Sequence, residues 1–271
     1  MSIEDKILQL TDLDFDEAVF VYKNFELARL MWLANEIRKI KVPGKEVGWI
    51  IDRNVNITNI CVARCKFCNF HKTMKQDGTY ITSLKEYRDK IEEMKVLGGR
   101  QLLLQGGLHP DLGISFYSDL FRNLKKEFPE INLHALGPPE IHFLARKEKM
   151  TYKEVLLELT LNGLDSLPGA GAEILCDDIR KQISPGKAGS DEWLAVMSEA
   201  HKLNLPTSAT MMYGHIEKPE DRITHLIKLR DLQSKKPKGN YGFVTFVPWP
   251  FMAEGTRLKK LYPGHYRQSA V

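Results

Sequence analysis

The chain has 271 residues, 43% of them hydrophobic and 27% charged, which is enough apolar material for one large domain with a buried core. Its net charge of +4 comes from scattered lysines and arginines, which argues against nucleic acid as a partner. The polar, acidic residues 1–6 do not form a secretory signal, and no apolar run is long enough to cross a bilayer, so we expect a cytoplasmic location without an integral membrane segment.

Periodic apolar residues predict one or two helices over residues 12–40. We therefore expect residues 1–48 to form an N-terminal helical segment and residues 49–271 to form the main domain. Six short apolar runs then predict strands at 56–60, 101–105, 131–136, 164–167, 207–212 and 241–247. Helices are expected between them, after capping boxes at 83–86 and 151–154, over 115–128 and 191–203, and from Pro219 onward.

Unusual clusters follow the predicted strands. They are the cysteines and residues 105–107, 137–140, 168–173, 213–215 and 248–251. In a parallel barrel the C-terminal ends of all strands meet on one face, whereas an open doubly wound sheet gathers only those beside a switch point. We therefore favour an α/β fold whose parallel strands curl into a partial or TIM-like (βα) barrel.

Three of the four cysteines, Cys61, Cys65 and Cys68, have the spacing C-x3-C-x2-C. In a reducing compartment such a cluster indicates a metal site more than disulfides. Three thiolates can hold a [4Fe–4S] cluster and leave one iron open to a substrate. Structural zinc, with His71 as the fourth ligand, is the alternative, although zinc knuckles usually come in pairs. Cys176 stands alone and is given no chemistry.

With Phe67 just before its last cysteine, and placed after the first strand of a βα barrel, this motif resembles the radical S-adenosylmethionine superfamily over residues 50–258. The resemblance implies that the open iron binds S-adenosylmethionine and that the reduced cluster cleaves it to a 5′-deoxyadenosyl radical. It also implies an electron donor such as flavodoxin or ferredoxin. The expected cofactor-binding residues are Phe67, Gly106 and Gly107 of the glycine-rich turn, and Glu173 for the ribose hydroxyls.

Further stretches resemble one branch of the superfamily, the branch of futalosine and deazaflavin-precursor enzymes. Residues 165–169 and 248–251 look most like cyclic dehypoxanthine futalosine synthase of menaquinone biosynthesis. That resemblance implies that the substrate is dehypoxanthine futalosine, and that loss of its ribose C4′ hydrogen leads to a cyclic spiro product. Aminofutalosine synthase or a deazaflavin-core synthase subunit is the alternative, and a zinc-stabilised binding module is a distant one.

Such a substrate needs a carboxylate clamp and a general base. Arg180 and Lys187 are the clamp candidates, because arginine offers a two-pronged fork, with solvated surface charge as the alternative. His215, at the end of the fifth predicted strand, is the expected catalytic base, with a histidine hydrogen-bonded inside the barrel rim as the alternative. Trp249 is expected to stack on adenine or on the substrate ring, or to pack in the core.

The end of the sequence departs from the superfamily. Members continue past the sixth strand with further barrel elements, whereas this sequence stops after residues 268–271. We therefore expect the C-terminal elements to be truncated or the barrel to be left open.

Overall fold

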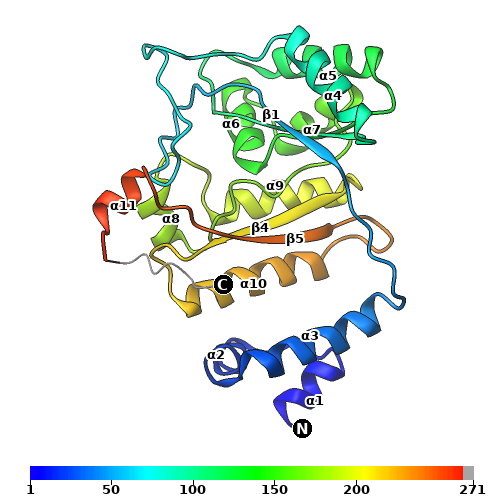
Figure 1. The fold of residues 1–271 in the computed structure, drawn as a ribbon, viewed down its shortest axis with the longest axis vertical. Helices are drawn as coiled ribbons and strands as arrows, with labels where there is room; N and C mark the ends of the chain where they lie inside the picture. The colour runs from blue at the N-terminus through cyan, green and yellow to red at the C-terminus, as the bar shows by residue number, and fades with distance from the viewer. Residues whose placement is uncertain (265–271) are drawn as a thin grey trace.

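The computed structural model describes residues 1–264, and parallel strands form its centre (Figure 1). One sheet has the order β1 (Asp52–Asn56), β2 (Gln101–Gln105), β3 (Asn132–Ala135), and in a second sheet β4 (Thr207–Tyr213) pairs with β5 (Phe243–Pro250). Parallel bridges from His134 to Ser166 and from Leu167 to Thr207 join the two sheets. The strands therefore follow the chain order, which confirms the predicted α/β fold and partial barrel.

Helices connect the strands and cover their outer side (Figure 1). They are α4 (Leu84–Val96), α5 (Ile114–Glu127), α6 (Pro138–Glu148), α7 (Tyr152–Leu161), α8 (Asp177–Ile183), α9 (Ser190–Lys202), α10 (Pro219–Ser234) and α11 (Arg257–Leu261). The pleat of β2 buries Leu102 and Leu104 in the main apolar core, together with residues of these helices. The alternate side chains, Gln105 among them, face the other side of the sheet and stay partly exposed.

Three further helices precede β1. They are α1 (Ile3–Leu8), α2 (Phe15–Asn24) and α3 (Leu27–Lys41), and the capping boxes at Ser2 and Asp14 begin the first two. They lie on the side of α10 that faces away from β4 and β5 (Figure 1), where Arg222 of α10 donates to the Tyr22 hydroxyl at 2.5 Å. The predicted boundary between an N-terminal helical segment and the main domain, near residue 48, falls between α3 and β1, and this division of the chain stays a prediction.

Two predicted strands differ from the observed ones. β1 ends at Asn56, and the predicted range 56–60 belongs mostly to the loop that follows, because Thr58 bridges to Ile81 in antiparallel fashion and turns the chain. The predicted strand 164–167 is reduced to its two bridging residues, because the Leu164 amide still closes α7 by donating to Leu159. The sequence does not predict α6 and α8. Two prolines at the start of α6 are typical of a loop, but proline also suits the first turn of a helix.

β5 has one open edge, because no other strand of the described part pairs with it there. Most of its side chains are exposed. The Phe251 amide donates to the Tyr213 carbonyl of β4. Because backbone nitrogens point to alternate edges along a strand, those of Pro248 and Pro250 point to the open edge. Proline loses no hydrogen bond of the sheet at such an edge. The predicted end of the barrel at residues 268–271 lies outside the described residues. Within residues 1–264 every helix is too short or too polar to span a membrane.

Candidate active site

A cavity of about 620 Å³ opens where the strands end. Segments from all parts of the barrel contribute to its wall, as expected for the C-terminal face of parallel strands. Its lining combines apolar and aromatic side chains with a few charged groups, which is typical of a small-molecule site. The lining residues are 67–70 after β1, Gln105, Gly106 and Leu108 after β2, Pro139 and Glu140 after β3, then Ala170, Gly171, Glu173, Lys187 and Thr210, and finally Trp249, Phe251, Met252 and Glu254.

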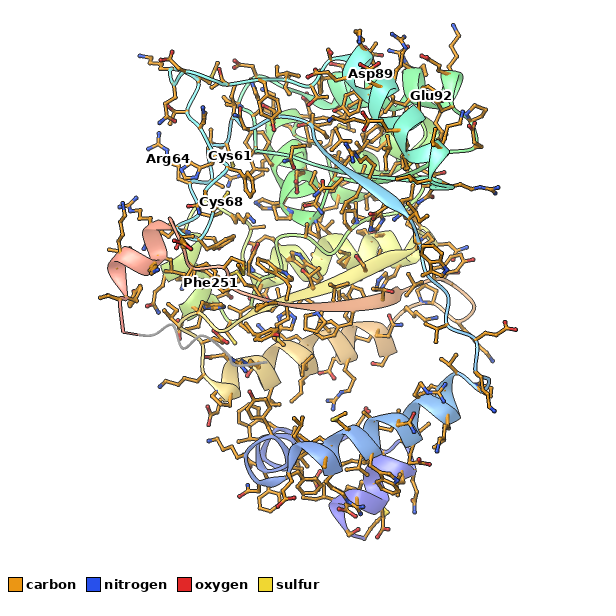
Figure 2. All side chains as sticks on the ribbon, viewed as in Figure 1. Cys61, Arg64, Cys68, Asp89, Glu92 and Phe251 are labelled. Carbon is orange, nitrogen blue, oxygen red and sulfur yellow. The ribbon has the colours of Figure 1, made fainter. Side chains whose placement is uncertain are left out.

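The loop that carries the three cysteines is tied to the protein on several sides. The Leu108 amide donates to Cys61 Sγ at 3.3 Å. The Lys66 amide donates to the Ile183 carbonyl of α8, and the Leu258 amide of α11 donates to the Lys66 carbonyl. Cys65 is buried, and the other two cysteines pack against the same small apolar cluster. Figure 2 shows Cys61 and Cys68 on the side of the molecule where Phe251 also lies.

All four cysteines are free thiols, so each of the three in the loop is available to bind one iron of a cluster. Within residues 1–264 no three His, Cys, Asp or Glu side chains converge on one metal position, and His71 Nδ1 lies 3.1 Å from the Cys68 carbonyl oxygen. The zinc alternative therefore gains no support, whereas a cubane cluster needs one thiolate for each of three separate irons. Burial raises the pKa of Cys65 to about 12, and the nearby Lys187 opposes that rise.

The predicted glycine-rich turn packs closely against the loop that carries the cysteines. Gly106 lines the cavity, whereas Gly107 packs against the cysteine loop itself. A Cβ atom on Gly107 would lie 2.1 Å from the Ile60 carbonyl oxygen and 2.8 Å from Cys61 Cβ. Glycine at this position lets the end of β2 approach the cysteines closely.

Gly107→Ala should therefore displace the cysteine loop and lower the iron and sulfide bound after anaerobic reconstitution, with an overpacking cost of about 1–3 kcal/mol. Gly48→Ala is the matched control, because a Cβ atom there meets nothing within 4 Å. Iron analysis and thermal unfolding measure both effects. Normal iron content and an unchanged unfolding midpoint in Gly107→Ala would contradict the close approach.

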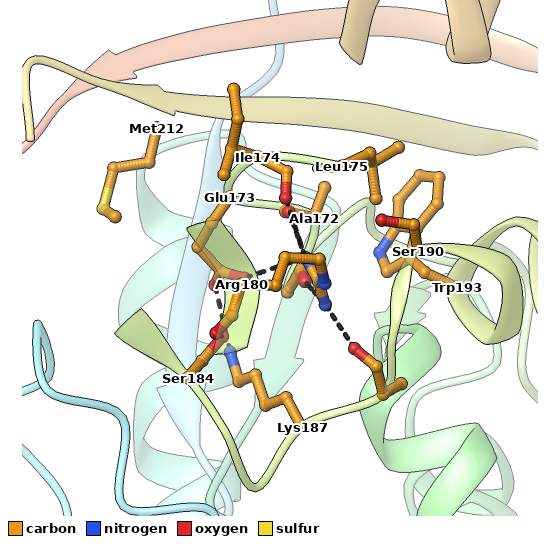
Figure 3. Close-up of polar contacts among 12 residues, drawn as sticks. Ala172, Glu173, Ile174, Leu175, Arg180, Ser184, Lys187, Ser190, Trp193 and Met212 are labelled. Atoms are coloured by element: carbon orange, nitrogen blue, oxygen red, sulfur yellow. Dashed lines mark hydrogen bonds and ion pairs between the residues drawn. The ribbon is translucent and has the colours of Figure 1, made fainter. Parts of the chain in front are cut away.

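Glu173, Lys187 and Arg180 form a buried charge cluster (Figure 3). Lys187 Nζ lies 3.0 Å from Glu173 Oε1, and an Arg180 guanidinium nitrogen lies 3.8 Å from Glu173 Oε2. Arg180 is 3% exposed and donates to the carbonyl oxygens of Gly171, Ala172, Ile174 and Ala188. The two terminal nitrogens of Arg180 are occupied by backbone carbonyl groups and Arg180 does not line the cavity, which disfavours the predicted clamp role.

Glu173 and Lys187, by contrast, face the cavity. Glu173 Oε2 is buried beside the Arg180 guanidinium and has no hydrogen-bond partner among the described residues, so it can accept a hydrogen bond from a ligand hydroxyl group. Burial would lower the pKa of Lys187, but the nearby Glu173 carboxylate outweighs this effect and raises that pKa, so Lys187 stays charged. The backbone of Glu173 has φ +40°, a strained conformation for a side-chain-bearing residue that is common at functional sites. Their assignments to cofactor and substrate stay predictions.

His215 is 3% exposed and lies behind the cavity wall. Its Nε2 is 3.1 Å from the Met212 carbonyl oxygen, and its Nδ1 is 3.2 Å from Glu217 Oε2. Burial lowers its pKa and Glu217 opposes that shift. The structure thus favours the alternative, a histidine hydrogen-bonded inside the rim, because His215 does not line the cavity, and its role as catalytic base stays a prediction.

Sequence reasoning missed Glu140, a buried carboxyl group in the cavity wall. Burial raises its pKa to about 7, while Lys187 and the backbone amides of Glu140 and Gly106 oppose that rise. A signal was present, since Glu140 ends one of the clusters that follow the predicted strands. Phe67 and Trp249, which were predicted, line the same cavity.

The sequence matches the family described as the Radical SAM superfamily over residues 55–229. This chain belongs to that superfamily. The expectations of a radical S-adenosylmethionine enzyme, of a [4Fe–4S] cluster and of S-adenosylmethionine as its cofactors are thereby confirmed for this radical SAM protein.

Solved structures agree with the fold of this radical SAM protein. Methylornithine synthase (PylB) has a TM-score of 0.68 at 16% identity, covering 95% of this chain and 70% of that one. HydG, a maturase of the [FeFe]-hydrogenase, has a TM-score of 0.70 at 17% identity, and the match covers 95% of this chain and 55% of HydG. At these identities the similarity establishes the fold alone.

Curated relatives of this radical SAM protein share a different name from the one predicted. Three of them are called 5-amino-6-(D-ribitylamino)uracil–L-tyrosine 4-hydroxyphenyl transferase. The relative from Methanosarcina mazei is 40% identical over 84% of this chain and 57% of its own length, and the relative from Synechocystis is 40% identical over 79% of this chain and 56% of its own length. The relative from Archaeoglobus fulgidus is 39% identical over 86% of this chain and 65% of its own length. The chain thus spans about three fifths of their length. The shared name of these relatives contradicts the prediction of cyclic dehypoxanthine futalosine synthase, and it gives no support to the prediction of menaquinone biosynthesis.

Proposed function

We propose that this radical SAM enzyme transfers the 4-hydroxyphenyl-bearing part of L-tyrosine to 5-amino-6-(D-ribitylamino)uracil. The observation that carries the proposal is the identity of about 40% over most of the chain to relatives of that name from several organisms. The deazaflavin-core alternative from the sequence corresponds to this reaction. Because the chain spans about three fifths of those relatives, the complete activity is part of the proposal.

The cavity supports this choice by its size and its walls. Its volume of about 620 Å³ suits two small ring compounds better than a macromolecule. Phe67, Trp249 and Phe251 offer aromatic surfaces on which a phenol ring and a uracil ring can stack. Lys187 Nζ lies 5.4 Å from the Phe67 ring centre and gives that wall a positive charge for a substrate carboxylate.

In this proposal Cys61, Cys65 and Cys68 hold the cluster at the cavity mouth. Once bound, the cluster supplies the electron that cleaves S-adenosylmethionine. The Gly106 backbone and the Glu173 carboxylate orient polar groups of a ligand, and the apolar wall keeps water away from a reactive radical. A flavodoxin-like or ferredoxin-like electron donor and a cytoplasmic location stay predictions.

The proposal is tested with the cluster-reconstituted protein, a reductant, S-adenosylmethionine, ring-labelled L-tyrosine and 5-amino-6-(D-ribitylamino)uracil under anaerobic conditions. We expect 5′-deoxyadenosine and a product that carries both the labelled ring and the ribitylaminouracil, detected by mass spectrometry. Dehypoxanthine futalosine, offered instead, should not be consumed. A preparation that cleaves S-adenosylmethionine but forms no labelled coupled product would contradict the proposal.

A further inference from the structure

The inner face of the barrel carries polar side chains where a parallel barrel is usually filled with branched apolar ones. Val55 of β1, Leu102 of β2 and Leu133 of β3 point outward into the main apolar core. The residues that alternate with them point inward, and with the exception of Leu103 they are polar. They are Asp52, Asn54 and Asn56 of β1, Gln101 and Gln105 of β2, and Asn132 and His134 of β3.

Together with Ser166, which bridges to His134, and with Ser208 and Thr210 of β4, these side chains form the polar inner face. Apart from Ser166 they are partly or fully exposed. Gln105 and Thr210, at the C-terminal end of the strands, line the cavity. Over the five residues of β2 the face extends for about 13 Å, since a strand rises about 3.3 Å per residue. The polar inner face thus begins at the cavity and is long enough for a linear chain of several carbon atoms.

Hydrogen bonds between neighbouring segments order part of this face. The Ser166 hydroxyl lies 2.7 Å from His134 Nδ1 and 3.3 Å from Asn132 Nδ2. Asn132 Nδ2 also donates to Gln101 Oε1 at 2.7 Å. The side-chain amide of Asn54, by contrast, has no hydrogen-bond partner within residues 1–264. The polar inner face therefore combines side chains that are held in place with side chains that are available to a ligand.

The polar inner face offers neutral hydrogen-bonding groups rather than charges. Burial lowers the pKa of His134 to about 4 and Asp52 opposes that shift, so the imidazole is uncharged near neutral pH. Asp52 is the one charged side chain of the face, and it lies at the end away from the cavity. Amides, hydroxyls and a neutral imidazole suit a ligand with several hydroxyl groups and no charge, and they offer no cation to a phosphate or a carboxylate.

We propose that the polar inner face binds a neutral polyhydroxylated chain of the substrate, namely the ribityl chain of 5-amino-6-(D-ribitylamino)uracil, where the identity of the ligand rests on the proposed function. Each hydroxyl group of that chain then meets amide, hydroxyl or imidazole groups that complement it as donors or acceptors. The uracil ring lies at the C-terminal end of the strands, beside the aromatic side chains of the cavity. L-Tyrosine has a carboxylate, for which this face has no cation, so the face selects between the two reactants.

The experiment compares two ligands and measures binding rather than turnover. Dissociation constants of 5-amino-6-(D-ribitylamino)uracil and of 5,6-diaminouracil, which lacks the ribityl chain, are determined by anaerobic equilibrium dialysis. The cluster-reconstituted chain is used in the presence of S-adenosylmethionine. The wild type should bind the ribityl compound about 100-fold more tightly than 5,6-diaminouracil, because several hydrogen bonds are lost with the chain.

Two variants locate this difference on the polar inner face. His134 and Asn54 lie in one layer of the sheet, on either side of Leu103. His134→Leu and Asn54→Leu should each weaken the ribityl compound by about 10-fold and leave the affinity for 5,6-diaminouracil unchanged, because each removes a hydrogen bond to the chain alone. Asn35→Leu is the control, since it removes an amide from the exposed surface of α3 and should change neither constant. The affinity for S-adenosylmethionine and the far-ultraviolet circular dichroism should stay those of the wild type in all three.

Wild-type protein that binds the two compounds equally well, or that binds neither, would overturn the inference. So would variants at His134 and Asn54 that leave the affinity for the ribityl compound unchanged, or that weaken both compounds alike. The assay for coupled product tests the proposed function separately. If the ribityl chain contributes to binding as expected but no coupled product forms, the proposed function fails and the inference holds. If product forms while the ribityl chain contributes nothing to binding, the function holds and the inference fails.

Discussion

Replacing any one of Cys61, Cys65 and Cys68 by alanine should reduce cleavage of S-adenosylmethionine to background. Each cysteine is expected to bind a different iron, so the loss of one thiolate removes a ligand that no neighbour replaces. Cys176→Ala should leave cleavage intact, because Cys176 lies at the start of α8 with its Sγ 3.5 Å from the Asp221 carbonyl oxygen. The measurements are 5′-deoxyadenosine formed by the reduced protein, and bound iron and sulfide.

Folding must be checked separately, since Cys65 is buried beside Ala63 and Leu108. The alanine variants should keep the far-ultraviolet circular dichroism of the wild type. A variant that retains the brown colour and cleaves at the wild-type rate would remove its cysteine from the ligand set. Wild-type protein that is colourless and holds stoichiometric zinc would contradict the whole assignment.

Glu173→Gln should destabilise the fold by about 3–5 kcal/mol, because it leaves Lys187 and Arg180 buried without a counter-charge. The free energy of unfolding in urea, measured on the cluster-free protein, tests this. Glu199→Gln breaks an exposed pair with Lys202 and should cost no more than about 1 kcal/mol.

Adding Lys187→Met to Glu173→Gln should recover part of that loss, since the second change removes one of the stranded charges. The double-mutant cycle should therefore give a coupling energy well above the error of the measurement. A loss in Glu173→Gln no larger than that in Glu199→Gln would show that the cluster is not energetically coupled.

The local patterns of this sequence predict the barrel and the cofactors of the superfamily well. The three cysteines lie in one short loop, so their spacing alone places them in one part of the molecule. Apart from residues 213–215, each cluster after a strand contributes to the cavity wall, because the parallel strands point the same way and their ends meet. Such features depend on distances along the chain or on strand direction, both of which the sequence contains.

The roles of Arg180, His215 and Glu140 could not be predicted in this way. Each is a charged or titratable residue near a strand end or a helix start, and the sequence is silent on which way its side chain turns. Arg180 turns inward onto the carbonyl groups around Glu173, and His215 is held between Met212 and Glu217. Glu140 turns into the cavity. Those directions are set by contacts between segments far apart in the chain.

The two prolines of β5 restrict what can join the open edge of the sheet. An additional strand requires backbone donors, and the Phe246 amide points to that edge whereas Pro248 and Pro250 have no amide hydrogen to give. A strand added here can pair along the first half of β5, but it has to leave the sheet where Trp249 and Phe251 border the cavity. The prolines thus protect the second half of this edge from self-association, and they confine any added strand to the half of β5 that lies away from the cavity.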